Sequence, residues 1–129
     1  MDYKDALGLA VANAAGIPKE DAVKLIETPA GTDMGDYAFP CFGLAKKLRK
    51  APPLIAQDLS GEIEKPTFIS TVKPSGGYIN FFLDRQSFIN DVLGDIRQAG
   101  GAFGGGNIGG GKTVCIDYSS INIAKPFHI

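Results

Sequence analysis

The chain has 129 residues, which is enough for about one domain built around a single hydrophobic core. Apolar residues make up 44% of it and the net charge is −1, so a globally basic packaging protein is excluded, whereas a local basic patch is not. No apolar run reaches the roughly 18 residues needed to span a bilayer. The N-terminus lacks the basic and apolar regions of a secretory signal, so we expect a cytoplasmic protein.

The first half of the chain carries helical patterns. Apolar residues at helical spacing predict a first helix ending near Gly16 and a second beginning near Pro18. Their apolar residues are Ala6, Leu7, Ala10, Val11 and Ala14, then Ala22, Val23, Leu25 and Ile26. The run 36–39 is ambiguous between a strand and a helix entry. Two further helical stripes follow, made of Cys41, Leu44, Ala45 and Leu48 and, after two prolines, of Ile55, Leu59 and Ile63.

The period then changes to that of strands. Residues 67–72 and 78–83 are rich in β-branched and aromatic side chains, and residues 74–77 read as a turn, so the sequence predicts a β-hairpin. Asp84 is placed to cap a closing helix, whose apolar face would consist of Phe88, Ile89, Val92, Leu93 and Ile96. Helices with antiparallel strands favour an α+β fold, a two-layer domain of helices packed on a small antiparallel sheet.

Glycine defines the organisation of the second half. Eight glycines lie between Gly100 and Gly111, and such a segment is costly to order, so it predicts a flexible linker. We therefore divide the chain into a domain at 1–99, a linker at 100–112 and a short tail at 113–129. The tail begins with a buried-type strand at 113–118. Its residues 119–122 break that strand.

The two cysteines, Cys41 and Cys115, both lie in apolar patterns. They are too far apart in sequence to form a CxxC site, and we expect both to be small core residues in a reducing compartment. With one histidine in the chain, a zinc site has too few ligands. The sequence therefore predicts no metal site.

A phosphate-binding loop is an alternative suggested by the linker. Residues Gly106 to Thr113 match GxxxxGK[ST], and 104–109 match GxGxxG. Both mechanisms need a strand before the loop and a helix after it, which is the reverse of the predicted order. We interpret the matches as products of glycine content, and keep a small nucleotide-binding protein as the alternative function.

The second predicted strand offers a candidate nucleic-acid surface. Because side chains alternate along a strand, Ile79, Phe81 and Leu83 would face the core. The opposite face would carry Tyr78, Asn80 and Phe82, and two aromatics flanking an amide suit base stacking and edge recognition. A basic cluster that could attract phosphates consists of Lys46, Lys47, Arg49 and Lys50. The alternative, with no binding role, is that the aromatic side chains pack under another element and the lysines form a solvated helix face.

The C-terminal residues 117–129, DYSSINIAKPFHI, resemble the start of the catalytic domain of arginyl-tRNA synthetases, ending at the first two residues of the HIGH motif. Ile121 replaces the family's usual proline. Further stretches resemble the same family's N-terminal additional domain: 26–29 (IETP), 35–38 (GDYA), 44–48 (LAKKL) and 77–81 (GYINF). The resemblance covers nearly the whole chain. It implies a class I aminoacyl-tRNA synthetase.

For the domain at 1–99, the resemblance implies the same α+β fold and a role in gripping the elbow of the arginine tRNA, mainly at its D-loop. The family's D-loop readers lie on a strand with the pattern aromatic-x-Asn, which matches Tyr78 and Asn80. The implied nucleic acid is therefore RNA and not DNA, and no membrane partner is implied.

For the tail, the resemblance implies a Rossmann-like catalytic domain that is truncated in its first strand. Asp117, Ser120 and Asn122 would bind arginine, and Lys125 and His128 would be catalytic residues acting on ATP. The longer parent would be an arginine–tRNA ligase that uses ATP with Mg as substrate. With most of that domain absent, we expect this chain to lack activity and to hold no cofactor of its own.

Overall fold

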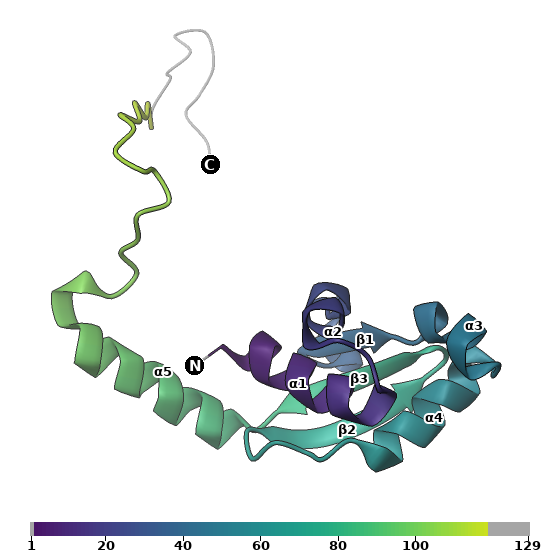
Figure 1. Cartoon of the computed structure of the whole chain (residues 1–129). Coiled ribbons are helices and arrows are strands. Elements are labelled where there is room, and N and C mark those ends of the chain that lie inside the picture. The colour runs from purple at the N-terminus through teal and green to yellow at the C-terminus, as the bar shows by residue number, and fades with distance from the viewer. Residues whose placement is uncertain (1, 119–129) are drawn as a thin grey trace, which may run out of the picture.

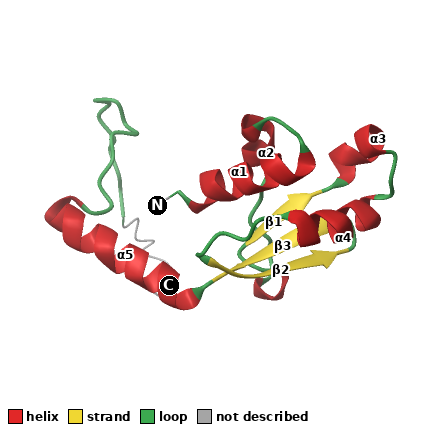
Figure 2. Ribbon diagram, turned by 60° about the horizontal axis from the view of Figure 1, so that its bottom comes forward, coloured by secondary structure: helices red, strands yellow, loops and turns green. Residues whose placement is uncertain are grey.

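The computed structural model describes residues 2–118 and contains one antiparallel sheet in that range. The strands are β1 (Tyr37–Pro40), β2 (Ile69–Ser75) and β3 (Tyr78–Leu83), in the order β1-β3-β2. The helices are α1 (Tyr3–Ala15), α2 (Lys19–Leu25), α3 (Ala45–Leu48), α4 (Pro52–Glu62) and α5 (Arg85–Ala99). Figures 1 and 2 show α1 and α4 covering one face of the sheet, so the expected α+β two-layer arrangement is confirmed.

The core lies between that sheet face and the helices. Phe39, Ile79 and Phe81 from the strands are fully buried, and Leu7 and Val11 from α1 meet them from the helical layer. The three apolar residues predicted for the fourth helix are also buried, namely Ile55, Leu59 and Ile63. The period-2 and period-3.6 patterns therefore identified the two halves of one core.

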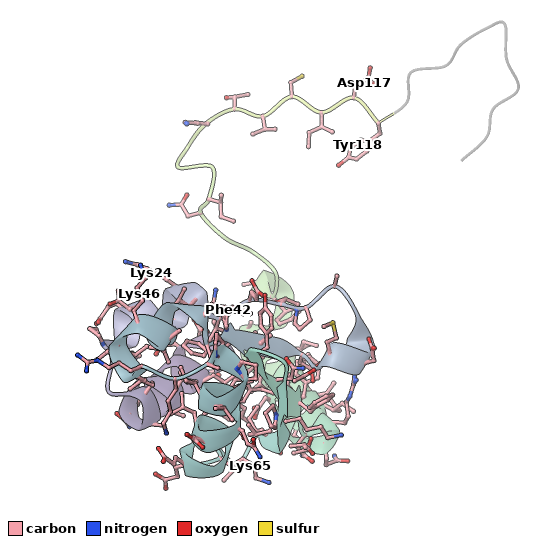
Figure 3. All side chains as sticks on the ribbon, turned by 90° about the vertical axis from the view of Figure 1, so that its right-hand side faces the viewer. Lys24, Phe42, Lys46, Lys65, Asp117 and Tyr118 are labelled. Atoms are coloured by element: carbon pink, nitrogen blue, oxygen red, sulfur yellow. The ribbon has the colours of Figure 1, made fainter. Side chains whose placement is uncertain are left out.

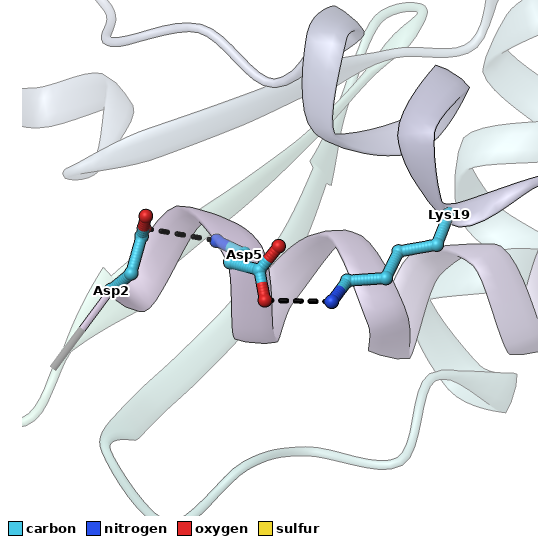
Figure 4. Close-up of polar contacts among 3 residues, drawn as sticks. All are labelled: Asp2, Asp5 and Lys19. Atoms are coloured by element: carbon cyan, nitrogen blue, oxygen red, sulfur yellow. Dashed lines mark hydrogen bonds and ion pairs between the residues drawn. The ribbon is translucent and has the colours of Figure 1, made fainter.

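Local signals set the ends of the first helix. The Asp2 carboxylate accepts a hydrogen bond from the backbone N–H of Asp5 at 3.1 Å, and the Asp5 carboxylate pairs with Lys19 of α2 at 2.7 Å (Figure 4). Gly16 ends α1 in the left-handed conformation at φ 61°, where glycine carries no steric penalty. The helix end predicted at Gly16 is confirmed.

Several predicted boundaries shift. The ambiguous run 36–39 forms strand β1 at Tyr37–Pro40, and β2 runs over Ile69–Ser75 instead of 67–72. The prediction placed Pro74 in the turn, but β2 is an edge strand, where a proline need not donate to a neighbour. The third helical stripe is broken into a 3-10 turn at Phe42–Leu44 and the short α3, which ends where Arg49 adopts φ 50°.

Helix α5 differs from the expected closing helix. Asp84 caps it as predicted, accepting from the backbone N–H of Ser87 at 2.8 Å. The helix nevertheless extends away from the sheet (Figures 1 and 2), and most of its apolar stripe is exposed. Its large exposed apolar residues are Phe88, Ile89, Leu93 and Ile96. The period predicted a helix with an apolar face but not what covers that face.

The residues after α5 contain a 3-10 turn at Gly100–Ala102 and then neither helix nor strand through 118. The strand predicted at 113–118 is wrong for this structure, because a strand requires a neighbouring strand to pair with. Cys115 is exposed, so its assignment to the core is wrong, whereas Cys41 is fully buried as expected and burial raises the pKa of its thiol to about 11. The division at residues 100 and 112 stays a prediction.

Candidate nucleic-acid interface

The central strand β3 separates the core from the face of the sheet that is turned away from α1 and α4, which we call the open face. Ile79 and Phe81 are fully buried against the helices, so Tyr78, Asn80 and Phe82 lie on the opposite face. The predicted core face is confirmed for Ile79 and Phe81, which belong to the core cluster, whereas Ala38, the partner of Asn80 on β1, is buried outside that cluster. Both neighbouring strands complete the face, because paired residues present their side chains on the same side.

The strand register determines which residues lie beside Asn80 on the two neighbouring strands. On β1 it pairs with Ala38, and on β2 it pairs with Lys73. Asn80 is only 6% exposed, yet its side-chain amide makes no hydrogen bond to any described residue. Because no fully buried side-chain nitrogen or oxygen in the described part of the chain lacks a partner, the amide of Asn80 keeps contact with solvent. A recessed amide with unused donors and an unused acceptor is suited to read the edge of a base.

Aromatic rings flank this amide along β3. Tyr78 is half-buried and its ring meets that of Phe42 edge-on, with centroids 5.3 Å apart and an interplanar angle of 77°. Phe82 is also half-buried, and the Lys73 ammonium lies 5.4 Å from the centroid of its ring. That distance is within the range of a cation–π contact. The face therefore combines stacking surfaces, a free amide and one positive charge.

Lys73 and Phe42 were not predicted from the sequence as members of this face. Lys73 could have been found from strand alternation, since it pairs with Asn80 and belongs to the same face. Phe42 gave no such signal, because it lies in the 3-10 turn after β1 and approaches Tyr78 only through the fold.

The predicted basic cluster is only partly free. Lys47 donates to the carbonyl of Gly16 at 2.6 Å, where it caps the end of α1, and Lys50 pairs with Asp58 at 2.6 Å. Asp58 also raises the pKa of Lys50, through a hydrogen bond and its charge. Lys46 and Arg49 are exposed and make no ion pair or hydrogen bond with the described residues.

The free charges of this cluster lie apart from Phe42. Figure 3 shows Lys46 on the same side of the molecule as Lys24 of α2, to the left of Phe42. Lys24 and Lys47 also line a groove between α2 and the turn that precedes α3. The positive charge directly beside Asn80 is thus Lys73, and a phosphate role for the predicted cluster stays a prediction.

The other predicted sites fall in the C-terminal part. Asp117 is exposed within the stretch that has no helix or strand, whereas Ser120, Asn122, Lys125 and His128 lie outside the described residues. The stretch from Gly106 to Thr113 follows α5 and a 3-10 turn, and no helix begins after it within residues 103–118. Within the described part of the chain, this stretch therefore lacks the preceding strand and the following helix that a phosphate-binding loop requires.

Two other features are absent from residues 2–118. No cluster of three or more histidine, cysteine, aspartate or glutamate residues there could hold a metal ion. None of the helices in that range is both long enough and apolar enough to cross a membrane.

Comparison with known proteins gives a consistent picture. The family described as "Arginyl tRNA synthetase N terminal domain" matches residues 1–83. An arginine–tRNA ligase of Clostridium botulinum (strain Alaska E43 / Type E3) is 45% identical over 129 residues, all of this chain and 23% of that ligase. One of Alkaliphilus metalliredigens is 44% identical over 114 residues, 88% of this chain and 20% of that ligase.

A solved structure is also similar. The arginyl-tRNA synthetase of Thermus thermophilus matches with a TM-score of 0.59 and 36% sequence identity, over 70% of this chain and 16% of that chain. The chain spans between a fifth and a quarter of the length of the curated relatives it matches. What these comparisons align is the N-terminal part of much longer proteins.

Proposed function

Because the chain belongs to the family of arginyl-tRNA synthetase N-terminal domains, we propose that it is the N-terminal part of an arginine–tRNA ligase and binds tRNA through the open face of its sheet. The observation that carries the proposal is the free, recessed amide of Asn80 between the rings of Tyr78 and Phe82. The longer protein would act in the cytoplasm, consuming ATP with Mg to activate arginine and attach it to its tRNA.

The chemistry of the face supports a role in reading an unpaired nucleotide. An unpaired base can stack on Tyr78 while its edge hydrogen-bonds to Asn80, and Lys73 is placed to contact an adjacent phosphate. The elbow of tRNA exposes unpaired bases in the D-loop, and the family resemblance of Tyr78 and Asn80 favours that site. Asp117, Ser120, Asn122, Lys125 and His128 would serve the arginine and ATP sites only within the longer protein.

Alanine variants of the two central residues test this proposal. We expect Tyr78→Ala and Asn80→Ala each to weaken binding of an arginine tRNA by about tenfold, the lower part of the range for one stacked or edge-bonded base. Binding would be titrated by fluorescence anisotropy at low salt, with the intact transcript and with one altered in its D-loop. The preference for the intact D-loop should disappear in both variants.

Matched controls come from the same chain. Tyr118→Ala removes a tyrosine that is 91% exposed, and Asn107→Ala removes an exposed asparagine, both remote in sequence from β3. We expect these variants to bind like the parent chain. Equal affinity for both transcripts in the parent chain, or unchanged affinity in Tyr78→Ala and Asn80→Ala, would contradict the proposal. Repeating the titration at higher salt separates phosphate contacts, which weaken steeply, from base contacts.

A further inference from the structure

The aromatic row on the open face extends beyond β3. The ring of Phe42 stands nearly perpendicular to that of Tyr78, at 77° with centroids 5.3 Å apart. Phe42 is 53% exposed, which is unusual for a phenylalanine in contact with another ring. The two rings therefore form an open corner at one end of the face, and we call the pair Phe42–Tyr78 the aromatic corner.

The backbone holds this corner in place. Cys41, fully buried, donates its N–H to the carbonyl of Gly77 at 2.8 Å, which ties the segment after β1 to the hairpin turn. A Cβ on Gly77 would lie 2.6 Å from Cζ of Phe42, so the ring can pack on the turn only because that residue is glycine. The corner is thus built before any ligand arrives, which lowers the entropy cost of binding.

The spacing along the face fits more than one nucleotide. Alternate residues of a strand are about 6.6 Å apart, so Tyr78, Asn80 and Phe82 span a row to which Phe42 adds one more ring beyond Tyr78. Sheets that bind single-stranded RNA stack two or three bases on aromatics placed in this way. Lys73, beside Asn80, supplies positive charge for the connecting phosphates.

We propose that the face holds two consecutive unpaired nucleotides of RNA, one read at Asn80 and its neighbour stacked in the aromatic corner against Phe42. This inference rests on the proposed function, since it takes the same face to be the RNA site. It adds a second nucleotide position and assigns it a residue, Phe42, that neither sequence pattern nor family resemblance indicated.

Phe42→Ala should weaken binding of the arginine tRNA by about tenfold, the order of effect of removing one stacking ring. Phe42→Leu keeps apolar bulk on Gly77 but has no ring face, so it should lose nearly as much affinity. Phe42→Tyr should restore binding. Phe103→Ala is the matched control, because Phe103 has almost the same exposure, 51%, and lies after α5.

A scan of the D-loop with single abasic nucleotides locates the second position. For the parent chain, two adjacent positions should each lose affinity when the base is removed. Phe42→Ala should become insensitive at one of them and Tyr78→Ala at the other. Phe42→Ala should still weaken binding in the Tyr78→Ala background, since the two rings serve different bases, although the two losses need not add because the rings are in contact.

The possible outcomes distinguish the proposed second nucleotide position from the proposed function on which it rests. If Tyr78→Ala and Asn80→Ala do not affect binding, the proposed function fails and the second nucleotide with it. If they weaken binding but the scan finds one sensitive position, or if Phe42→Ala costs nothing in the Tyr78→Ala background, the face reads a single nucleotide and Phe42 only orients Tyr78. Thermal unfolding of each variant identifies any loss of affinity that comes from loss of fold.

Discussion

Helices α1 and α5 have the same kind of sequence pattern and opposite environments. In α1 the apolar residues Leu7 and Val11 are fully buried under the sheet and α4. In α5 the corresponding residues Ile89 and Leu93 are 49% and 47% exposed, although their helical spacing is equally regular. Periodicity therefore specifies a helix and its apolar face, whereas burial depends on which other elements reach that face.

The contact between α1 and the first turns of α5 is narrow. Tyr3 of α1 stacks near Phe68 and Phe88, with ring centroids 5.0 and 6.1 Å away, and its hydroxyl donates to the carboxylate of Asp91 at 2.7 Å. The ring of Tyr3 thus bridges the sheet domain and the first turns of α5. Most of α5 beyond this point gains its stability from its own backbone and cap rather than from packing.

The greatest contrast in stability is expected between the truncation of a leucine in α1 and the truncation of one in α5. Leu7→Ala should lower the free energy of unfolding by about 3 kcal/mol, because it leaves a cavity in a closed core. Leu93→Ala should change it by less than about 0.5 kcal/mol, because little packing is lost at a position that is 47% exposed. Urea unfolding of the whole chain, followed by circular dichroism, measures both. Similar losses in the two variants would show that α5 is packed as tightly as α1.

A smaller effect of opposite sign is expected on the open face. Asn80 lies on the central strand, where β-branched residues are favoured, and its amide is recessed without a hydrogen bond to the described residues. Asn80→Val should therefore raise the free energy of unfolding by about 1 kcal/mol while it weakens tRNA binding. Destabilisation by this variant would show instead that the amide is satisfied in the folded chain, and would remove the structural sign of a binding role.

The smallest change in stability is expected at the hydrogen bond between Tyr3 of α1 and Asp91 of α5. Tyr3→Phe removes the hydrogen bond to Asp91 and should lower the free energy of unfolding by about 0.5 kcal/mol at neutral pH. Tyr118→Phe, at an exposed position, should leave it unchanged.

The same bond has a predictable pH dependence. Burial, followed by the hydrogen bond and charge of Asp91, raises the pKa of Tyr3 from 10.0 to about 12. The folded chain therefore holds the phenolic proton more tightly than the unfolded chain, so this contribution is complete below pH 10 and is lost as the pH rises toward 12. The stability difference between the parent chain and Tyr3→Phe should narrow over that interval. A gap that stays constant would mean that the hydroxyl does not bridge the two regions.

Much of the sheet domain was predictable because its signals are local. Alternation along 78–83 separated Ile79 and Phe81 from Tyr78 and Asn80, and Asp84 and Gly16 marked helix ends through their capping chemistry. The candidate interface was predictable to the same extent, in the residues that one strand supplies. Its other members, Lys73 and Phe42, were not, since they enter through strand register and a turn that packs on Gly77.

Local sequence patterns identified most helices and strands of residues 1–99, the apolar side of each, and the resemblance to arginyl-tRNA synthetases, because these depend on neighbouring residues and on motif letters. The folded structure was needed to show that the apolar face of α5 is exposed and that Phe42 contacts Tyr78. It was also needed to show that Lys47 is bonded to Gly16 and Lys50 is paired with Asp58. Such contacts join residues distant in sequence, so they exist only once the backbone has closed on itself.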